Sequence, residues 1–339
     1  MRMKKVLRVL QGVGKWIGFV LLAFITGIVI SFNTSPKLFA SMIAQMPQLA
    51  KVGPSPKGWD QYEVQVHRTA NITYPSKFTN NTLDLYTPDK NQGKQPVIFW
   101  LHGGAFVSGS KEAVRDWAYK MTATQGYNMV AVNYEVAPNA QYPDQIIQLG
   151  EAIQYFKDHQ AEYPQLDMNR IIIGGDSAGA QMASQYIAVQ TNPKLAKEMN
   201  LTPQLAPKQI IAAVLYCGPY DMKTLATIQN KALQFMVNQL GWAYMGTRDW
   251  VNTKQAQESS TTDQVTDDFP PTFLTDGNTG SFEGHAQKLA SVLKEHNVPV
   301  STLFFGPNQA VYHEYQFQLR SKNAVLAFNQ TAAFLNQYR

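Results

Sequence analysis

The segment Gly175-Asp-Ser177-Ala-Gly179 places a serine hydroxyl between two glycines. The apolar run 171–173 leads into it with the character of a buried strand, and 180–187 leaves it with the character of a helix. A sharp turn between strand and helix needs glycines there, because a side chain would clash, and it presents the serine as a nucleophile for acyl transfer. The five-residue string alone is a weak signal, and its strand–helix setting makes it a strong one.

A tetrahedral acyl-transfer intermediate carries an oxyanion, which preorganised N–H donors must stabilise. The segment 102–106, His-Gly-Gly-Ala-Phe, follows the apolar run 97–101 directly. Glycines allow close approach of the backbone, so we expect the N–H groups of Gly103 and Gly104 to join that of Ala178 in an oxyanion hole. Taken by itself the segment is equally compatible with a plain glycine-rich turn. The serine downstream favours the functional interpretation.

A serine nucleophile needs a base that takes its proton. His313 follows the apolar run 300–305 at a distance that suits a loop reaching back to Ser177, so we predict that it is this base. The remaining histidines are interpreted as structural or exposed side chains: His67, His102, His159, His285 and His296.

Three motifs together resemble those of the α/β-hydrolase superfamily. Within it, the chain resembles the esterases related to hormone-sensitive lipase and the bacterial feruloyl/acetyl-xylan type carboxylesterases. The motifs are 102–106, Tyr134-Glu-Val-Ala-Pro138 with Tyr142-Pro143 after it, and 175–179. The similarity covers about 60–339 and is uncertain in 222–268. The resemblance implies a Ser–acid–His triad in that chain order, with no metal and no cofactor.

The acid of this triad departs from the family pattern, in which an aspartate follows Gly-x-x after the seventh strand. Here Gly280 stands at that position. Glu283, three residues on, can reach back because of its extra methylene, and Asp276 stands at the end of the preceding apolar run. We favour Glu283 narrowly over Asp276. Asp221 is a third candidate, and an alternative is that a carbonyl or Asn278 orients the histidine.

Apolar runs alternate with helical patterns along most of the chain, which predicts a mostly parallel sheet with helices on both faces. Two leading β-rich segments at 62–74 and 82–86 should form its antiparallel edge. The other predicted strands are 96–101, 129–134, 170–174, 210–216, 272–275 and 300–305. The predicted helices are 116–125, 144–160, 178–190, 282–295 and 323–337. The Met-, Trp- and Tyr-rich stretch 222–268 interrupts the alternation and is interpreted as a lid insertion.

The N-terminus carries the basic charge of the chain. The first 59 residues hold eight Lys or Arg and no acid, which leaves 21 basic against 24 acidic residues in the rest, so nucleic-acid binding is a poor interpretation. Residues 16–32 form an uncharged apolar run just long enough to span a bilayer, with a basic segment 1–15 before it and a linker 33–59 after it. By the positive-inside rule, 1–15 is cytoplasmic and the hydrolase domain 60–339 lies outside. The alternatives are a cleaved signal, which would leave the domain secreted, and a buried core helix.

These features predict a membrane-anchored serine esterase that acts on a short-chain or acetyl ester of a saccharide or small lipid through an acyl-enzyme. One alternative is a serine peptidase, although this chain has no room for a large substrate domain. The other is a surface module that keeps the hydrolase fold for binding only.

Overall fold

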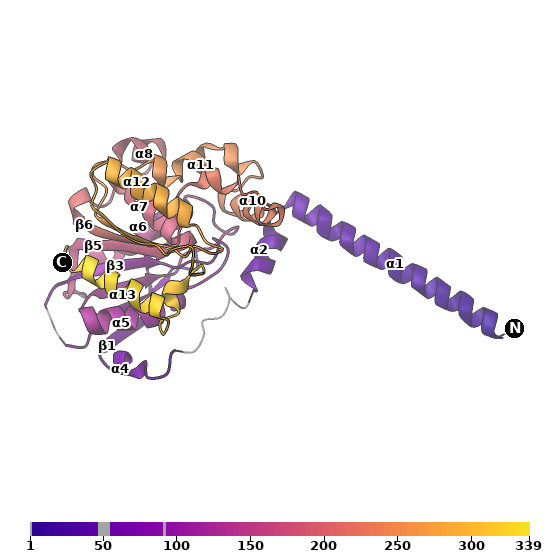
Figure 1. The fold of residues 1–339 in the computed structure, drawn as a ribbon, viewed down its shortest axis with the longest axis horizontal. Coiled ribbons are helices and arrows are strands. Elements are labelled where there is room, and N and C mark those ends of the chain that lie inside the picture. Colours follow the sequence, from indigo (N-terminus) through magenta and orange to yellow (C-terminus); the bar gives the residue numbers. More distant parts are fainter. Residues whose placement is uncertain (1, 47–54, 91–92) are drawn as a thin grey trace.

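A mixed sheet of eight strands forms the centre of the computed structural model, which describes residues 2–46, 55–90 and 93–339 (Figure 1). The strand order is β1-β2-β4-β3-β5-β6-β7-β8. β1 pairs antiparallel with β2 and β2 with β4, and every other pair is parallel. The strands are β1 (Val66–Thr73), β2 (Thr82–Pro88), β3 (Gln95–Leu101), β4 (Asn128–Val132), β5 (Leu166–Asp176), β6 (Ile210–Tyr216), β7 (Thr272–Thr275) and β8 (Val300–Leu303). The predicted parallel sheet with an antiparallel edge is confirmed.

Helices cover both faces of the sheet, as its continuous apolar strands require. Alternate side chains of β5 enter different cores: Ile171 and Ile173 pack on one face and Ile172 on the other. The first core receives α6 (Asp144–Asp158), α7 (Ala178–Thr191), α8 (Pro193–Glu198) and α12 (Glu283–Glu295). The second receives α5 (Arg115–Gln125) and α13 (Lys322–Leu335). The parallel strands therefore end in loops at one edge of a sheet that is buried on both sides.

The first predicted strand begins later than its pattern suggested. Residues 60–63 form the short helix α4 (Asp60–Glu63), and β1 starts at Val66. Trp59, directly before α4, is buried and donates its indole N–H to the carbonyl of Asp116 on α5. This contact anchors the start of the domain against a helix, which alternation of residue types could not reveal.

A single long helix, α1 (Arg2–Thr34), projects from the domain (Figure 1). Within the described residues, its segment Leu10–Thr34 alone is long and apolar enough to cross a membrane, with a mean hydropathy of 2.2 and none of its most apolar window buried. The predicted span 16–32 lies inside this segment. The predicted basic segment 1–15 is helical from Arg2, and Met1 lies outside the described residues.

The stretch 33–59 differs from the linker that its prolines predicted. After α1 ends, a second helix, α2 (Lys37–Ala44), packs on α10 (Lys231–Met245), and its residues Ala40 and Ile43 are buried in the first core. Residues 47–54 lie outside the described part. Pro36 therefore marks the boundary between two helices, because proline is tolerated where a helix begins.

The insertion 222–268 consists of short helices and turns at the edge of the sheet where the parallel strands end. They are α9 (Met222–Leu225), α10, α11 (Lys254–Glu258) and the 3-10 turns η3 (Trp250–Asn252) and η4 (Thr261–Asp263). Much of this segment is core, since Tyr244 and Trp250 are fully buried. Gly241 of α10 packs so closely on Trp250 that an added Cβ would lie 2.2 Å from its indole ring.

Candidate active site

Ser177 stands at the junction of β5 and α7, as its motif predicted. Its backbone has φ 50° and ψ −120°, a conformation that is costly for any residue with a Cβ and that occurs at active sites where surrounding structure imposes it. The Ser177 N–H donates to the carbonyl of Tyr216 at 2.8 Å, which ties the turn to the neighbouring strand β6. The hydroxyl therefore projects from a strained, well-supported turn at the strand ends.

Close packing explains the two glycines of this turn. A Cβ on Gly179 would lie 2.1 Å from the carbonyl oxygen of Leu101, and one on Gly175 would lie 2.5 Å from the backbone of Gly179. In both cases the added Cβ would meet backbone atoms, which cannot move aside without moving β3 or the start of α7. The glycines thus allow α7 to start directly against β3 and β5.

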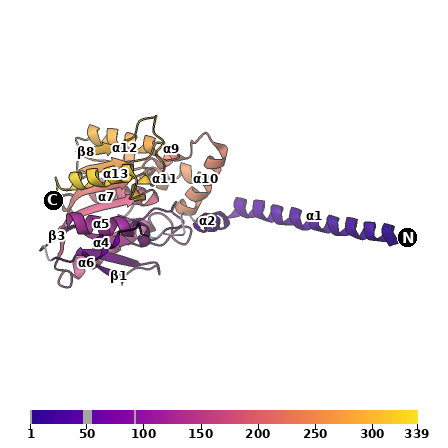
Figure 2. The ribbon, with the colours of Figure 1, turned by 60° about the horizontal axis from the view of Figure 1, so that its bottom comes forward.

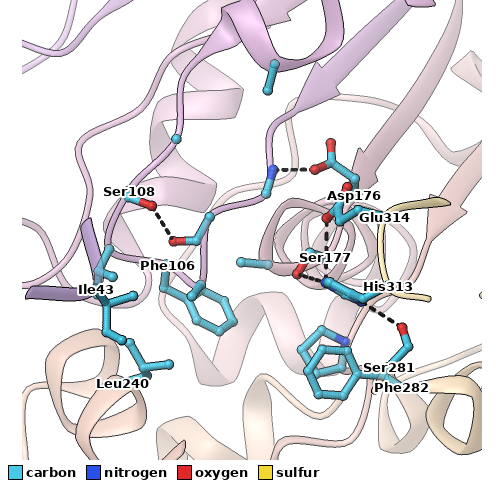
Figure 3. A pocket seen from close by; sticks show the side chains of 18 of the residues that line it. Ile43, Phe106, Ser108, Asp176, Ser177, Leu240, Ser281, Phe282, His313 and Glu314 are labelled. Carbon is cyan, nitrogen blue, oxygen red and sulfur yellow. Dashed lines mark hydrogen bonds and ion pairs between the residues drawn. The ribbon is translucent and has the colours of Figure 1, made fainter. Parts of the chain in front are cut away.

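His313 lies on the loop after β8 and meets the serine hydroxyl. Its Nε2 is 2.9 Å from Ser177 Oγ, although the two residues are 136 positions apart in the chain (Figure 3). Burial lowers the pKa of His313 to about 4, so the imidazole is neutral near pH 7 and can accept a proton. The geometry and the charge state both suit a general base.

The other nitrogen of His313 does not meet a carboxylate. Nδ1 is 2.7 Å from Ser281 Oγ (Figure 3), and the Ser281 hydroxyl in turn donates to Oδ1 of Asp276. A hydroxyl has one hydrogen to give. Since Ser281 gives its hydrogen to Asp276, Nδ1 must carry the histidine's proton and donate to Ser281. This arrangement leaves the Nε2 lone pair directed at Ser177.

Asp276 is fully buried at the end of β7, and backbone donors surround it. Gly277 N–H donates to Oδ1 at 2.7 Å and Phe282 N–H donates to Oδ2 at 3.1 Å. Burial nevertheless dominates and raises the pKa of Asp276 to about 7, and the nearby Glu283 adds to the rise. The carboxyl therefore titrates in the range in which hydrolases work.

The sequence-based preference for Glu283 is not supported by contacts. Glu283 is the first residue of α12 and is half-buried, and within the described residues no hydrogen bond joins it to His313. Asp221, the third candidate, caps α9 by accepting from Thr224 N–H and forms an ion pair with Lys288. The contacts therefore favour Asp276 over Glu283 as the candidate acid, because the loop 277–282 folds back over the Asp276 side chain.

The loop after β3 approaches the nucleophile, but its donors are arranged differently from the expectation. Gly103 N–H donates to Oδ2 of Asp176 at 2.7 Å, so it is not free to bind an oxyanion. Gly104, at φ +128°, and Ala105, at φ 55°, follow in left-handed backbone, and both line the pocket beside Ser177. Ala178 occupies the first turn of α7, where N–H groups have no acceptor within the helix. The geometry retains Gly104 and Ala178 as candidate donors and replaces Gly103 with Ala105.

His102 holds this loop in place and does not enter the chemistry. Its ring is fully buried and stacks on Tyr134 with centroids 4.2 Å apart. Its Nδ1 is 2.7 Å from the carbonyl of Gly103, and the Tyr134 hydroxyl donates to the carbonyl of His102. Burial lowers the pKa of His102 to about 4, so the ring is neutral and its Nδ1–H is the donor to Gly103.

Two carboxyl side chains, those of Asp176 and Glu314, form a hydrogen-bonded pair behind the nucleophile. Asp176 is buried and accepts the indole N–H of Trp100 at 2.7 Å, and the side chain of Glu314 hydrogen-bonds to it. Burial and the charge of Asp176 raise the pKa of Glu314 well above its usual range, whereas the pKa of Asp176 rises only to about 6, again through burial. The pair therefore holds one proton between its two carboxyls, which reduces the negative charge beside the oxyanion site.

The pocket in front of Ser177 has a volume of about 1260 Å³. Ser177 and His313 line it together with Phe106 of the β3 loop, Ile43 of α2 and Leu240 of α10 (Figure 3). Phe106 stacks on Tyr244 of α10 with ring centroids 4.1 Å apart. The insertion is therefore packed directly on the loop that carries the candidate oxyanion donors.

One group of possible metal ligands occurs among the described residues, and it coincides with this site. It consists of Cys217, Asp276 and His313. Burial raises the pKa of the Cys217 thiol well above its usual range, which disfavours the thiolate that metals bind. His313 and Asp276 are already joined through Ser281. The donor set therefore fits a hydrogen-bonded relay better than a metal site.

This fold is that of an α/β-hydrolase, and Ser177 is the candidate nucleophile of its site. Residues 83–289 match the BD-FAE family, and the chain belongs to that family. It is 27% identical over 233 residues to the probable carboxylic ester hydrolase LipM of Mycobacterium tuberculosis, which covers 66% of this chain and 52% of that protein. It is 30% identical over 115 residues to an acetyl esterase of Salmonella schwarzengrund, which covers 34% of this chain and 35% of that protein.

Solved structures share the fold at lower identity. Esterase B of Lactobacillus rhamnosis aligns with a TM-score of 0.70 and 19% identity over 92% of this chain and 96% or more of its own. A bacterial heroin esterase aligns with a TM-score of 0.65 and 18% identity over 91% of this chain and 93% of its own. The chain spans between about a third and two thirds of the length of the curated relatives it matches.

Two functional residues carry no sequence signal. Ser281 is an ordinary serine in a loop, and its place between His313 and Asp276 depends on how 277–282 folds. Glu314 follows the base directly and looked like a neighbour only, yet its Oε1 lies 3.6 Å from His313 Nε2. The only hint of Ser281 in the sequence is indirect. The loop has Gly280 where the family pattern has an aspartate, so another group must face the histidine.

Proposed function

We propose that this chain is a serine hydrolase that cleaves carboxylic esters. The observation that carries the proposal is the 2.9 Å contact between Ser177 Oγ and His313 Nε2 at a strained strand–helix turn. The fold and the names of the relatives, which include a carboxylic ester hydrolase and acetyl esterases, support the same reaction class.

In the proposed reaction Ser177 Oγ attacks the ester carbonyl carbon while His313 Nε2 takes the hydroxyl proton. The N–H groups of Gly104, Ala105 and Ala178 bind the resulting oxyanion. His313 then gives its proton to the departing alcohol, which leaves an acyl-enzyme. A water molecule, deprotonated by the same nitrogen, releases the acid and restores Ser177.

Asp276 acts through Ser281 in this scheme. The Nδ1–H of His313 donates to Ser281, whose hydroxyl donates to the carboxylate, so one continuous chain of donors fixes the tautomer. When His313 becomes positively charged, the Asp276 carboxylate stabilises this charge through the intervening Ser281 hydroxyl. Asp176 and Glu314 are hydrogen-bonded and burial raises the pKa of both carboxyls, so the pair holds a proton between them and avoids a second negative charge beside the oxyanion.

The apolar pocket supports a short-chain or acetyl ester of a saccharide or small lipid as the substrate class. Aliphatic side chains from α2 and α10 line it, together with the polar groups around Ser177 and His313. The contact of Tyr244 with Phe106 supports a lid role for 222–268, because movement of α10 would move the oxyanion loop.

We propose further that α1 is an uncleaved anchor and that the catalytic domain lies outside the cytoplasm. The basic residues before the apolar segment support this orientation. The end of α1 packs on the domain: Phe32 contacts Phe39 and Phe235, and its carbonyl accepts the side-chain amide of Gln239 at 2.9 Å. Removal of α1 would leave these groups without their partners, which favours retention over cleavage.

A fluorophosphonate probe tests the proposal directly, because it modifies only an activated serine. We expect labelling of the full-length protein and of Ser291→Ala, a control at an exposed helix serine, and none of Ser177→Ala. Hydrolysis of 4-nitrophenyl acetate should fall on the order of 10⁶-fold in Ser177→Ala. Labelling without ester hydrolysis, but with cleavage of a peptidyl 4-nitroanilide, would favour the peptidase alternative. Absence of both would favour a binding module.

A further inference from the structure

The outer part of the active-site pocket is built next to the point where α1 leaves the domain. α2 begins at Lys37, three residues after α1 ends at Thr34, and it packs against α10 (Figure 2). Ile43 and Met46 from the first segment and Leu233, Met236 and Leu240 from the second line the pocket. The same two helices therefore form both the pocket entrance and the base of the apolar helix.

Aromatic contacts fix the direction of α1 relative to this entrance. The rings of Phe32, Phe39 and Phe235 form a triangle with centroid separations of 5.6 to 6.1 Å. Arg248 adds a hydrogen bond to the side-chain oxygen of Asn33 at 2.9 Å. The contacts of Phe32 and Asn33 join the last turn of α1 to α2 and to the α10 region, and the contact of Phe39 with Phe235 joins α2 to α10. A membrane that holds α1 must therefore meet the domain on this side.

Exposed apolar side chains collect on the same face. Outside α1, nine large hydrophobic residues are exposed in the described part of the chain, and five of them belong to α2, its end, or α10. These five residues define the interfacial face: Leu38, Met42, Met46, Leu233 and Phe235. A cluster of this kind marks an interaction surface, since scattered single residues are the ordinary pattern.

The two segments that carry the interfacial face hold basic and no acidic residues. The sequence has no Asp or Glu between residues 1 and 59, and none between 222 and 248. Lys37, Lys231 and Arg248 are exposed there. Basic residues that flank an apolar face are attracted to anionic lipid headgroups, whereas acids would be repelled.

We propose that the interfacial face rests in the surface of the bilayer that holds α1, and that the pocket receives its substrate from that bilayer. The substrate class is then an ester whose acyl or alcohol part is apolar enough to reside in the membrane. This inference rests on the proposed esterase function and deepens it by naming the substrate's source. The proposed occupant of the face is lipid, and the tests below distinguish it from a second copy or a protein partner.

Depth-dependent fluorescence quenching tests the position of the face. The full-length protein, carrying bimane on Met42→Cys, is placed in vesicles of phosphatidylcholine and phosphatidylglycerol that contain brominated acyl chains. Val325→Cys on α13 is the matched control, because Val325 is an exposed apolar side chain outside the interfacial face, and the native Cys217 is buried. We expect quenching at position 42 and none at 325. Equal fluorescence at both sites would overturn the proposal, as would quenching at 42 that appears only with a protein-bound quencher on a second copy.

Hydrolysis of two esters tests the substrate's source. The double variant Leu38→Ser with Met42→Ser changes side chains that are 38% and 52% exposed and do not line the pocket, and Val325→Ser with Leu326→Ser, at 37% and 42%, is its control. For a diacylglycerol dispersed in the vesicles we expect the first variant to be about tenfold slower than the control, because membrane contact scales with buried apolar area. For dissolved 4-nitrophenyl acetate we expect equal rates.

The two proposals fail differently. If the wild-type protein cleaves the dissolved ester and leaves the vesicle-borne ester intact, the membrane-fed pocket is wrong and the esterase function stands. If the wild type and Ser177→Ala are equally inactive on both esters, the function itself is wrong. Loss of equal size on both substrates in the Leu38/Met42 variant would also contradict the inference, since a lipid contact cannot act on a dissolved substrate.

Discussion

The loop after β5 and the loop after β7 both position catalytic groups, but they do so by different physical means. The first holds Ser177 between glycines whose hydrogens touch neighbouring backbone, so that no side chain fits there. The second is closely packed at Gly277, where an added Cβ would lie 2.5 Å from two backbone carbonyl oxygens, but open at Gly280, which has no atom within 4 Å of an added Cβ. In this second loop a hydroxyl conveys the carboxylate's effect to His313. The nucleophile is therefore positioned by packing, whereas the acid is positioned by hydrogen bonds.

Alanine at the glycines of the two loops should separate packing from hydrogen bonding. Gly179→Ala forces a Cβ to within 2.1 Å of a backbone carbonyl, and we expect a loss of folding stability of about 3 kcal/mol or more. Gly280→Ala meets no atoms and only strains a residue at φ +61°, which costs about 1 kcal/mol. Thermal unfolding of both variants provides the measurement. A Gly179→Ala protein as stable as Gly280→Ala would show that the elbow is not held by packing.

Among changes to the loop after β7, removal of the carboxylate should have the largest effect on the chemistry. Asp276→Asn retains the size of the side chain but loses the charge that fixes the histidine tautomer, so we expect kcat to fall about 10⁴-fold. Glu283→Gln is the control, because Glu283 makes no hydrogen bond to His313 in the described structure, and its kcat should stay within a few-fold of wild type. The reverse result would restore Glu283 as the acid.

Deletion of the connecting hydroxyl should have an intermediate effect. Ser281→Ala leaves Asp276 ionisable but removes its connection to His313, and we expect kcat to fall about 10²-fold, in the range of one lost positioned catalytic group. Ser281→Thr, which keeps the hydroxyl, should recover most of the activity. Equal activity of Ser281→Ala and wild type would mean that Asp276 does not act through this residue.

The pH profile should report Asp276, because His313 is neutral above its pKa of about 4. Below pH 7 the carboxyl of Asp276, with a pKa of about 7, holds a proton and donates it to Ser281. Ser281 then donates to Nδ1, which places the histidine's own proton on Nε2, where it blocks proton transfer from Ser177. We therefore expect kcat/KM to rise about tenfold per pH unit up to pH 7 and then to level off.

The same profile recorded for Asp276→Asn is the control for this prediction. Its residual activity should be flat between pH 5 and 8, since no carboxyl remains to titrate in the relay. A wild-type profile with its only acid limb near pH 4 would assign the limb to His313 and leave Asp276 ionised throughout.

Much of the site was predictable from residue order. The run 171–173, the glycines around Ser177 and the helix after it are neighbours in the chain, so local backbone preference determines the elbow. The position of His313 followed from the topology, because parallel strands all end at the same edge, where the long loop after the last strand can reach across to the loop after β5. The alternation of apolar runs and helices defined the sheet for the same reason.

The remaining features depend on side chains that meet only after folding. The choice between Asp276 and Glu283 was decided by where 277–282 places Ser281, a matter of one loop conformation and one rotamer. The engagement of Gly103 by Asp176, 73 residues away, and the packing of α1 on α10 have no local pattern. The sequence by itself determined the sheet, the nucleophile and the base, because each depends on periodicity and chain order. Only the tertiary structure pointed to Asp276 as the candidate acid, to the candidate oxyanion donors and to the proposed membrane-facing entrance, because each depends on contacts between distant segments.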